Sequence, residues 1–278
     1  MTIDEYKRWR AEECPRTLVM GILNVTPDSF SDGGKYFKPE LAVGRAMNMI
    51  SEGADIIDIG GESTRPGAEP VPLEEEIQRI IPVIQAVRTH SNCMISVDSY
   101  KASVTEAALN NGADMINDIS GLSFDQRMAT VAAAAAVPVI IMHIKGKPRN
   151  MQVNPDYENL LREIKDYFNT RIDLALKAGV KNYNIVLDPG IGFGKRLDDN
   201  FELIRKLGQI AAMGYPVLLG PSRKSFIGHV LNVPVEDRLE GTAAAVTAGI
   251  LTGARMIRVH DIQAMKRVIT IADRIALG

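Results

Sequence analysis

Cysteine is scarce in this sequence, and the two that occur do not form a recognisable metal or redox motif. Cys14 and Cys93 share no zinc or dithiol spacing, and two thiols among 278 residues are typical of a reducing compartment. Long apolar runs are missing too, since none reaches the ~18–20 residues of a membrane-spanning helix. The N-terminal residues mix charges and lack the apolar stretch of a signal peptide. These absences predict a cytoplasmic protein with no membrane partner.

The sequence also lacks an excess of charge of either sign. It has 32 Lys and Arg against 34 Asp and Glu, and no basic block or low-complexity tail. Binding to nucleic acid or to an anionic membrane through bulk charge needs concentrated positive charge, so the composition does not support either.

What the sequence does have is a regular alternation of short apolar runs with amphipathic segments. The apolar runs predict strands at 17–25, 55–59, 94–97, 115–119, 139–142, 185–187, 217–220 and 256–259. The segments between them predict helices at 39–52, 73–89, 101–111, 125–136, 159–178, 199–212 and 240–251, with a last helix closing the chain.

Eight alternating strand–helix units indicate an α/β fold of the TIM-barrel type, because such units form parallel sheets and eight of them close a (β/α)8 barrel. We predict one barrel domain over residues 17–278. Residues 1–16 are expected as a short N-terminal extension, either a helical turn or a plug over one end of the barrel. An open doubly wound sheet is the alternative, but no Gly-x-Gly-x-x-Gly fingerprint follows the first strand.

A short repeat supports the barrel. Gly-Ala-Asp occurs at 53–55 and 112–114, and Gly-Ala-Arg at 253–255, each time after a predicted helix. Glycine suits the left-handed position that ends a helix. Five positions after each glycine stands a polar residue, namely Asp58, Asn117 or Arg258. The equal offset predicts that these three side chains lie at one height on one face of their strands.

Polar residues also stand at or just beyond the ends of the predicted strands. They are Asn24, Asp58, Asp98, Asn117, His143, Asp188, Lys224, Arg258 and His260. In a barrel these positions converge at the C-terminal mouth, where barrel active sites are built. A single polar residue at a strand end can simply cap backbone or pair with a neighbour, but nine together indicate a site.

The set divides by charge. Asp98, Asn117 and Asp188 are rich in acceptors and suit a heterocycle with adjacent N–H donors, such as a 2-amino-4-oxo ring, or else a metal. Arg65, Lys224, Arg258 and His260 form the opposite pole, which suits a phosphate or diphosphate. Asn24 and the loop residue Asp28 are candidates to place a hard cation such as Mg²⁺.

Several runs together resemble the dihydropteroate synthases. The resemblance covers residues 17–278 and rests on Met20-Gly-Ile-Leu-Asn-Val-Thr-Pro-Asp-Ser-Phe-Ser-Asp-Gly-Gly34, Asp58-Ile-Gly-Gly-Glu-Ser-Thr-Arg-Pro-Gly67, Ser96-Val-Asp-Ser-Tyr-Lys101, Asn117-Asp-Ile-Ser-Gly121, Asp188-Pro-Gly-Ile-Gly-Phe-Gly194, Ser222-Arg-Lys-Ser-Phe226 and Arg258-Val-His260. It implies an enzyme that joins 6-hydroxymethyl-7,8-dihydropterin diphosphate to p-aminobenzoate, releasing pyrophosphate and forming 7,8-dihydropteroate for folate.

The resemblance also implies residue roles. Asp98, Asn117, Asp188 and Lys224 would hold the pterin, with Arg258 stacking on its ring. Asn24, Arg65, Arg258 and His260 would bind the diphosphate, with Mg²⁺ as cofactor and Asn24 as its ligand. Thr64, Pro66, Phe193, Lys224 and Ser225 would frame the p-aminobenzoate, whose site sulfonamides imitate. Asp98, Arg65 and Lys224 would act in catalysis.

Family members are usually dimers, so a homodimer is expected. The loop His143-Ile-Lys-Gly-Lys147 departs from the usual Met and Thr at its third and fifth positions. Two rival functions share the pterin pocket: a corrinoid-linked methyltetrahydrofolate methyltransferase and a non-catalytic pterin-binding paralogue. The methyltransferase would not need Ser63-Thr-Arg65 or Ser222-Arg-Lys-Ser225, and the paralogue should have lost one of the charged or loop residues, which are all present.

Overall fold

The chain folds into a closed barrel of eight parallel strands in sequential order, which confirms the predicted TIM-barrel fold. The computed structural model describes residues 1–13, 15–26 and 39–278. Each strand pairs with the next, and the first pairs with the last to close the ring. The strands are β1 (Leu18–Asn24), β2 (Ile56–Gly60), β3 (Met94–Asp98), β4 (Met115–Asp118), β5 (Val139–Met142), β6 (Ile185–Asp188), β7 (Val217–Leu219) and β8 (Ala254–Val259).

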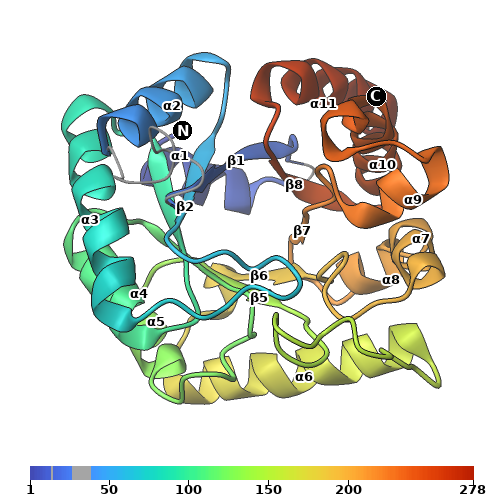
Figure 1. Cartoon of the computed structure of the whole chain (residues 1–278), viewed down its shortest axis with the longest axis horizontal. Helices are drawn as coiled ribbons and strands as arrows, with labels where there is room; N and C mark the ends of the chain where they lie inside the picture. The colour runs from blue at the N-terminus through green and yellow to red at the C-terminus, as the bar shows by residue number, and fades with distance from the viewer. Residues whose placement is uncertain (14, 27–38) are drawn as a thin grey trace.

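Helices surround this ring, as Figure 1 shows. They are α1 (Ile3–Ala11), α2 (Pro39–Ser51), α3 (Leu73–His90), α4 (Ala102–Asn110), α5 (Met128–Ala135), α6 (Leu160–Ala178), α7 (Leu197–Arg205), α8 (Gly208–Ala211), α9 (Ser225–Leu231), α10 (Leu239–Leu251) and α11 (Ile262–Leu277), with short 3₁₀ turns at Asn182–Asn184 and Val235–Asp237. Among the described residues, none of these helices combines the length and apolarity needed to cross a membrane.

Three helical segments differ from the sequence prediction. The helix predicted at 199–212 is two helices, α7 and α8, because the backbone leaves helical geometry at Lys206, with ψ at 17°. The helix predicted at 125–136 begins only at Met128, because the Asp125 carboxylate accepts hydrogen bonds from the backbone N–H groups of Ala102 and Arg127. Helix α9 lies where the sequence pattern predicts no helix.

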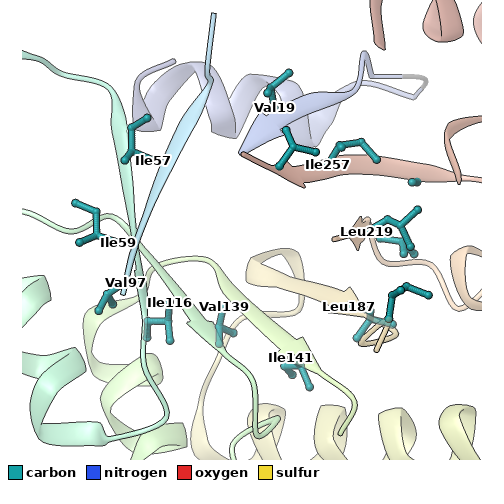
Figure 2. Packing of buried hydrophobic residues seen from close by; sticks show 14 of the residues in the cluster. Val19, Ile57, Ile59, Val97, Ile116, Val139, Ile141, Leu187, Leu219 and Ile257 are labelled. Atoms are coloured by element: carbon teal, nitrogen blue, oxygen red, sulfur yellow. The ribbon is translucent and has the colours of Figure 1, made fainter. Parts of the chain in front are cut away.

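The outward-facing side chains of the strands pack against the helices. Figure 2 shows this layer, in which Ile57 and Ile59 of β2, Val97 of β3 and Ile116 of β4 point away from the barrel axis. All four are fully buried. Burying a side chain of this size stabilises the fold by about 1.5–3 kcal/mol, so this layer holds the helices to the barrel.

The inward-facing side chains near the start of the strands form a second apolar layer. Every strand contributes to it, through Leu18, Met20, Ile56, Met94, Met115, Ile140, Val186, Leu218 and Met256. Tyr6 and Trp9 of α1 join the same cluster and are buried, and the backbone N–H of Met94 donates to the carbonyl of Met1. Helix α1 therefore plugs the N-terminal end of the barrel. The filled floor leaves the opposite end as the place for a site.

Candidate active site

Above the apolar layer, the same strands carry polar side chains into the barrel. Side chains alternate between the two faces of a strand, so the residue two positions beyond an inward apolar residue points inward again. That step leads to Asp58 in β2, to Ser96 and then Asp98 in β3, to Asn117 in β4, to Asp188 in β6 and to Arg258 in β8. All are buried except Arg258, which is half-buried.

The three residues of the glycine repeat meet in this layer. Gly53, Gly112 and Gly253 adopt φ angles of 104°, 109° and 118°, the left-handed geometry expected at the end of a helix. The predicted common height is confirmed, because Asp58 contacts the other two side chains. Its Oδ2 accepts a 2.6 Å hydrogen bond from Nε of Arg258 and a 2.9 Å hydrogen bond from Nδ2 of Asn117.

Arg258 is shared between two carboxylates. While Nε contacts Asp58, Nη2 donates to Oδ2 of Asp98 over 2.6 Å. The sequence pattern predicts Arg258 in a positive pole opposite the acceptors, whereas its guanidinium lies among them. The reason is burial: a carboxylate with no exposed surface, such as Asp58, is costly without a neighbouring cation.

Each of the two carboxylates keeps one oxygen for another partner. Oδ1 of Asp58 and Oδ1 of Asp98 are buried and have no hydrogen-bond donor among the described residues. Burial raises the pKa of the Asp98 carboxyl, and Arg258 opposes that rise. Buried acceptors of this kind call for N–H donors, which a ligand can bring.

Asp188 and Lys224 approach this acceptor layer from β6 and from the residue that precedes α9. Oδ1 of Asp188 accepts a 2.7 Å hydrogen bond from the N–H of Gly190, and burial raises its pKa to about 6. Burial and then the charge of Arg258 lower the pKa of Lys224 to about 8, while Asp188 and Asp98 oppose this. The Lys224 ammonium also lies 4.1 Å from the ring centre of Phe193. Acceptors and a cation therefore share one buried region.

His260, predicted from the sequence to belong to the positive pole, is not a cation at pH 7. Burial, and then the charges of Arg258 and Arg223, lower its pKa to about 4, so the imidazole is neutral at pH 7. Its Nδ1 is hydrogen-bonded to Oγ of Ser222 over 2.9 Å, and the backbone N–H of His260 donates to the same oxygen over 3.2 Å. The positive pole at the rim is thus Arg65, Lys224 and the edge of Arg258, with His260 as a neutral neighbour.

The loop at 61–72 carries three further candidates. Thr64 is half-buried, and Arg65 and Pro66 are exposed. Arg65 lies close enough to His260 to lower its pKa. The N–H of Gly67 donates to the carbonyl of Pro148, which follows β5, over 3.3 Å. In Figure 1 the blue-to-cyan segment after β2 crosses in front of β5 and β6, so the loop extends over the mouth.

A cavity of about 770 Å³ opens beside this loop. Its lining includes Pro66, Ser225, Gly192 and Lys195 but none of the deep carboxylates. It is therefore a vestibule outside the polar layer. Gly192 connects the two regions, because a Cβ at this glycine would lie 3.2 Å from Cδ of Lys224.

Phe193 is held by a buried pair that is not apparent from the sequence. The Lys195 ammonium lies 3.0 Å from Nδ1 of His143 and donates to the carbonyl of Phe193 over 3.0 Å. Burial lowers the pKa of Lys195 to about 7 and that of His143 as well. Gly190 lets the loops after β5 and β6 meet, because a Cβ there would collide with the His143 carbonyl oxygen. In the sequence, only the position of His143 at the end of a predicted strand indicated that this residue belongs to the site.

Asn24 stands at the end of β1, level with Gly60 of β2, and is half-buried. Asp28, the other candidate for a cation, lies outside the described residues. Among the described residues, no three His, Cys, Asp or Glu side chains are grouped to hold a metal. A lone amide oxygen suits a hard cation that takes its other ligands from water and a substrate diphosphate.

Comparison with known proteins identifies related chains over nearly the whole length. The family model described as "Pterin binding enzyme" matches residues 20–260. A dihydropteroate synthase of Synechocystis is 49% identical over 259 residues, which are 93% of this chain and 90% of that protein. One from Bacillus subtilis is 50% identical over 258 residues, covering 93% and 88%.

Solved structures agree. A Clostridium difficile dihydropteroate synthase crystallised in the presence of pteroic acid has a TM-score of 0.89 and 46% identity, covering 94% of this chain and 97% of that one. A Yersinia pestis enzyme in complex with a sulfonamide drug has a TM-score of 0.90 and 41% identity, covering 95% of each chain. A Xanthomonas albilineans enzyme with 4-aminobenzoic acid has a TM-score of 0.89 and 40% identity, covering 95% and 94%.

Proposed function

Because this chain belongs to the pterin-binding enzymes, and within them to the dihydropteroate synthases, we propose that its barrel mouth holds a pterin diphosphate in the polar layer and p-aminobenzoate outside it. The protein is a transferase that makes 7,8-dihydropteroate from these two substrates and releases pyrophosphate. The observation that carries the placement is the ring of buried acceptors at Asp58, Asp98, Asn117 and Asp188, two of which keep an oxygen without a donor among the described residues.

The pterin ring belongs in the acceptor layer. Its 2-amino group and ring N–H present adjacent donors, and a carboxylate such as Asp188 accepts two parallel N–H bonds. Hydrogen bonds to a charged group contribute about 1.5–3 kcal/mol each, which favours this ring over one without donors. Asn117 and Lys224 would complete the contacts to the ring, and Arg258 would lie against it while its charge remains tied to Asp98.

The diphosphate belongs at the rim. Arg65 and Lys224 supply positive charge there, and His260 can donate one hydrogen bond as a neutral imidazole or take a proton when an anion arrives. Asn24 would be the protein ligand of Mg²⁺, which when bound withdraws charge from the diphosphate oxygens and makes them a better leaving group.

The p-aminobenzoate belongs between the loops. Pro66 and Ser225 line the vestibule together, and Lys224 lies over the ring of Phe193 on its inner side. With Thr64 these residues would frame the arylamine in a slot between apolar walls, with a cation for its carboxylate. The vestibule beyond the slot leaves room for arylamines that carry larger substituents, as sulfonamides do.

The reaction then follows from the charges. The bond from the pterin methylene carbon to the diphosphate oxygen breaks first, and its electron pair leaves with the diphosphate. Asp98 faces the ring on which positive charge develops, and fixed charges of this kind stabilise the transition state without reorganising. The arylamine nitrogen is neutral at pH 7 and forms the new C–N bond, after which it loses a proton to the departing diphosphate or water. No strong base is required.

The competing functions gain no support from the site. A corrinoid-linked methyltransferase would not need the loop residues Ser63–Arg65, and a non-catalytic paralogue should lack one of the charged residues at the rim or in the deep polar layer.

We also propose that the protein is a cytoplasmic homodimer. Support comes from Ile271 and Ile275, large apolar side chains of α11 that are 63% and 64% exposed, and from the scarcity of cysteine.

A positional isotope exchange experiment tests departure before attack. The pterin diphosphate is labelled with ¹⁸O in the bridge between the methylene carbon and the phosphorus. It is then incubated with enzyme, Mg²⁺ and benzoate, which fills the arylamine slot but has no amino group. Departure and return should scramble the label into the non-bridging oxygens. A parallel incubation with p-aminobenzoate in place of benzoate shows that the enzyme is active. Full retention of the label in the bridge by this active enzyme would contradict the order of steps.

A further inference from the structure

One cation near the mouth binds two carboxylates that the proposed mechanism does not use. The Lys101 ammonium donates to Oε2 of Glu62 over 2.7 Å and to Oε2 of Glu76 over 2.6 Å. The Lys101 side chain is 19% exposed, and the two carboxylates are 7% and 1% exposed. Buried ions of this kind are held only where their partners are well placed.

Both carboxylate oxygens of Glu62 accept hydrogen bonds. Oε2 also accepts a 2.8 Å hydrogen bond from the N–H of Val71, and Oε1 accepts a 2.5 Å hydrogen bond from the hydroxyl of Tyr100. The Tyr100 ring packs edge-on against Phe124, with 5.4 Å between the ring centres. Tyr100 and Lys101 stand two and three residues after Asp98, between the end of β3 and the start of α4, so the anchor is built next to a strand end.

The anchored residues are the two ends of one loop. Glu62 immediately precedes Ser63-Thr64-Arg65-Pro66, and Val71 comes just before α3 begins at Leu73. The Lys101 ammonium also donates to the carbonyl of Val71 over 2.5 Å, so one group holds both ends.

The backbone at Gly61 is closed in as well. Arg79 donates to the Gly61 carbonyl over 2.7 Å, and a Cβ at Gly61 would lie 2.9 Å from Cγ of Glu76. The base of the loop is therefore fixed from both α3 and the strand end that follows.

The tip of the loop is held more weakly. Its hydrogen bonds and ion pairs with other described segments are the Gly67–Pro148 backbone hydrogen bond and an ion pair between Arg149 and Glu69, whose side chains are 71% and 70% exposed. Exposed ion pairs contribute about 0–1 kcal/mol. The direction in which Thr64, Arg65 and Pro66 point is therefore set at the base of the loop.

We propose that Lys101, assisted by Tyr100, is a positioning residue for catalysis: it fixes Glu62 and Val71 and so places the loop at 61–72 over the diphosphate and arylamine sites. This rests on the proposed function, which gives Arg65, Thr64 and Pro66 their contacts. Lys101 acts through the loop and touches neither substrate. Its loss weakens the steps that need the loop and spares pterin binding in the deep layer.

The test compares Lys101→Met, Tyr100→Phe and Lys101→Arg with Arg88→Met as a matched control. Arg88 is also a partly buried cation, bonded to Asp114 and to the carbonyls of Gly112 and Cys93, but at the opposite end of the barrel. For each variant, steady-state kinetics gives kcat and the KM for p-aminobenzoate, calorimetry gives the Kd for pterin-6-carboxylate, and thermal unfolding gives Tm.

Lys101→Met should raise the KM for p-aminobenzoate and lower kcat so that kcat/KM falls about tenfold to hundredfold, because small misplacements of positioning groups have effects of this size. Its Kd for pterin-6-carboxylate should stay within about twofold. Tyr100→Phe should show a smaller loss of the same kind with a small decrease in Tm, because one buried oxygen of Glu62 loses its donor. Lys101→Arg, whose fork can reach two carboxylates, should recover part of the activity. Arg88→Met should lower Tm and leave kcat/KM near that of the wild type.

The proposal is overturned if the pterin Kd rises as much as kcat/KM falls, or if Arg88→Met reproduces the kinetic pattern at an equal loss of Tm. Should Lys101→Met not fold, Tyr100→Phe, which removes one oxygen, decides the matter. Arg65→Ala is measured in parallel. A large loss with Arg65→Ala and none with the Lys101 and Tyr100 variants would overturn the anchor alone, whereas no loss with Arg65→Ala would overturn the loop's part in the proposed function.

Discussion

Replacing Arg258 by methionine tests the idea that one guanidinium holds the floor of the site together. The change removes both ion pairs and leaves Asp58 and Asp98, 0% and 6% exposed, without their shared cation. Breaking a buried pair by removing one partner costs about 3–5 kcal/mol. Because the Arg258 side chain is 19% exposed, we expect the lower end, a loss of about 3 kcal/mol in the free energy of unfolding at pH 8.

The loss should depend on pH, and its sign follows from proton linkage. Arg258 opposes the rise in the pKa of Asp98 that burial causes, so its removal lets that pKa rise further. The folded variant then binds a proton at a higher pH than the unfolded chain, whose Asp titrates near pH 3.9. Over that interval stability increases as the pH falls. Because the pKa of Asp98 is already about 7 in the wild type, which therefore also gains stability as the pH falls, the deficit should shrink only from about 3 kcal/mol at pH 8 to about 2 kcal/mol at pH 5.5.

Urea unfolding of the wild type and of Arg258→Met at both pH values measures these differences. A double variant, Asp58→Asn with Arg258→Met, removes one of the unpaired charges and should regain part of the stability at pH 8. A deficit below about 1 kcal/mol at pH 8, or an equal deficit at the two pH values, would refute the shared-cation account.

Three further predictions concern single positions. Pterin binding needs the ionised Asp188 carboxylate, whose pKa is about 6, so the Kd measured by calorimetry should rise about tenfold per pH unit below pH 6. Asp188→Asn should bind weakly, and its Kd should not depend on pH in this way. A wild-type Kd that is flat from pH 5 to 8 would contradict this prediction. Arg65→Ala should lower turnover far more than pterin affinity, and equal losses would count against its place on a loop over the mouth. Gly190→Ala should lower the free energy of unfolding, measured with urea, by about 1–3 kcal/mol, because the φ of Gly190 is 69° and the new Cβ would meet the His143 carbonyl. An unchanged urea midpoint would show that the loops after β5 and β6 can separate at no cost.

Much of the architecture was predictable because it depends on local patterns. Strand positions follow from short apolar runs, and the common height of Asp58, Asn117 and Arg258 follows from their equal distance from a helix-ending glycine. Both patterns are periodic along the chain, so they need no knowledge of contacts between distant segments.

The features that were not predictable depend on three-dimensional neighbours. Arg258 was expected among the cations of the rim, but it bonds Asp58 and Asp98, which lie 200 and 160 positions away in the sequence. His260 was expected to be charged, but burial and two nearby guanidiniums keep it neutral. Neither effect leaves a trace in residue spacing, because each is set by distances across the barrel.

Helix α9 was missed for a related reason. Its sequence, Ser225–Leu231, is too short to show a helical period, and it contains Gly228. A Cβ at this glycine would meet the guanidinium of Arg238, so the glycine leaves room for a side chain from the segment that follows.

Product formation by the purified protein tests the central claim most directly. The protein is incubated with 6-hydroxymethyl-7,8-dihydropterin diphosphate and p-aminobenzoate, with Mg²⁺ or with EDTA, and dihydropteroate and pyrophosphate are quantified by mass spectrometry and by a coupled phosphate assay. Equal amounts of the two products, formed only when both substrates and Mg²⁺ are present, are the predicted result. Hydrolysis of the pterin diphosphate to the alcohol alone, or no reaction in the presence of Mg²⁺, would contradict the account.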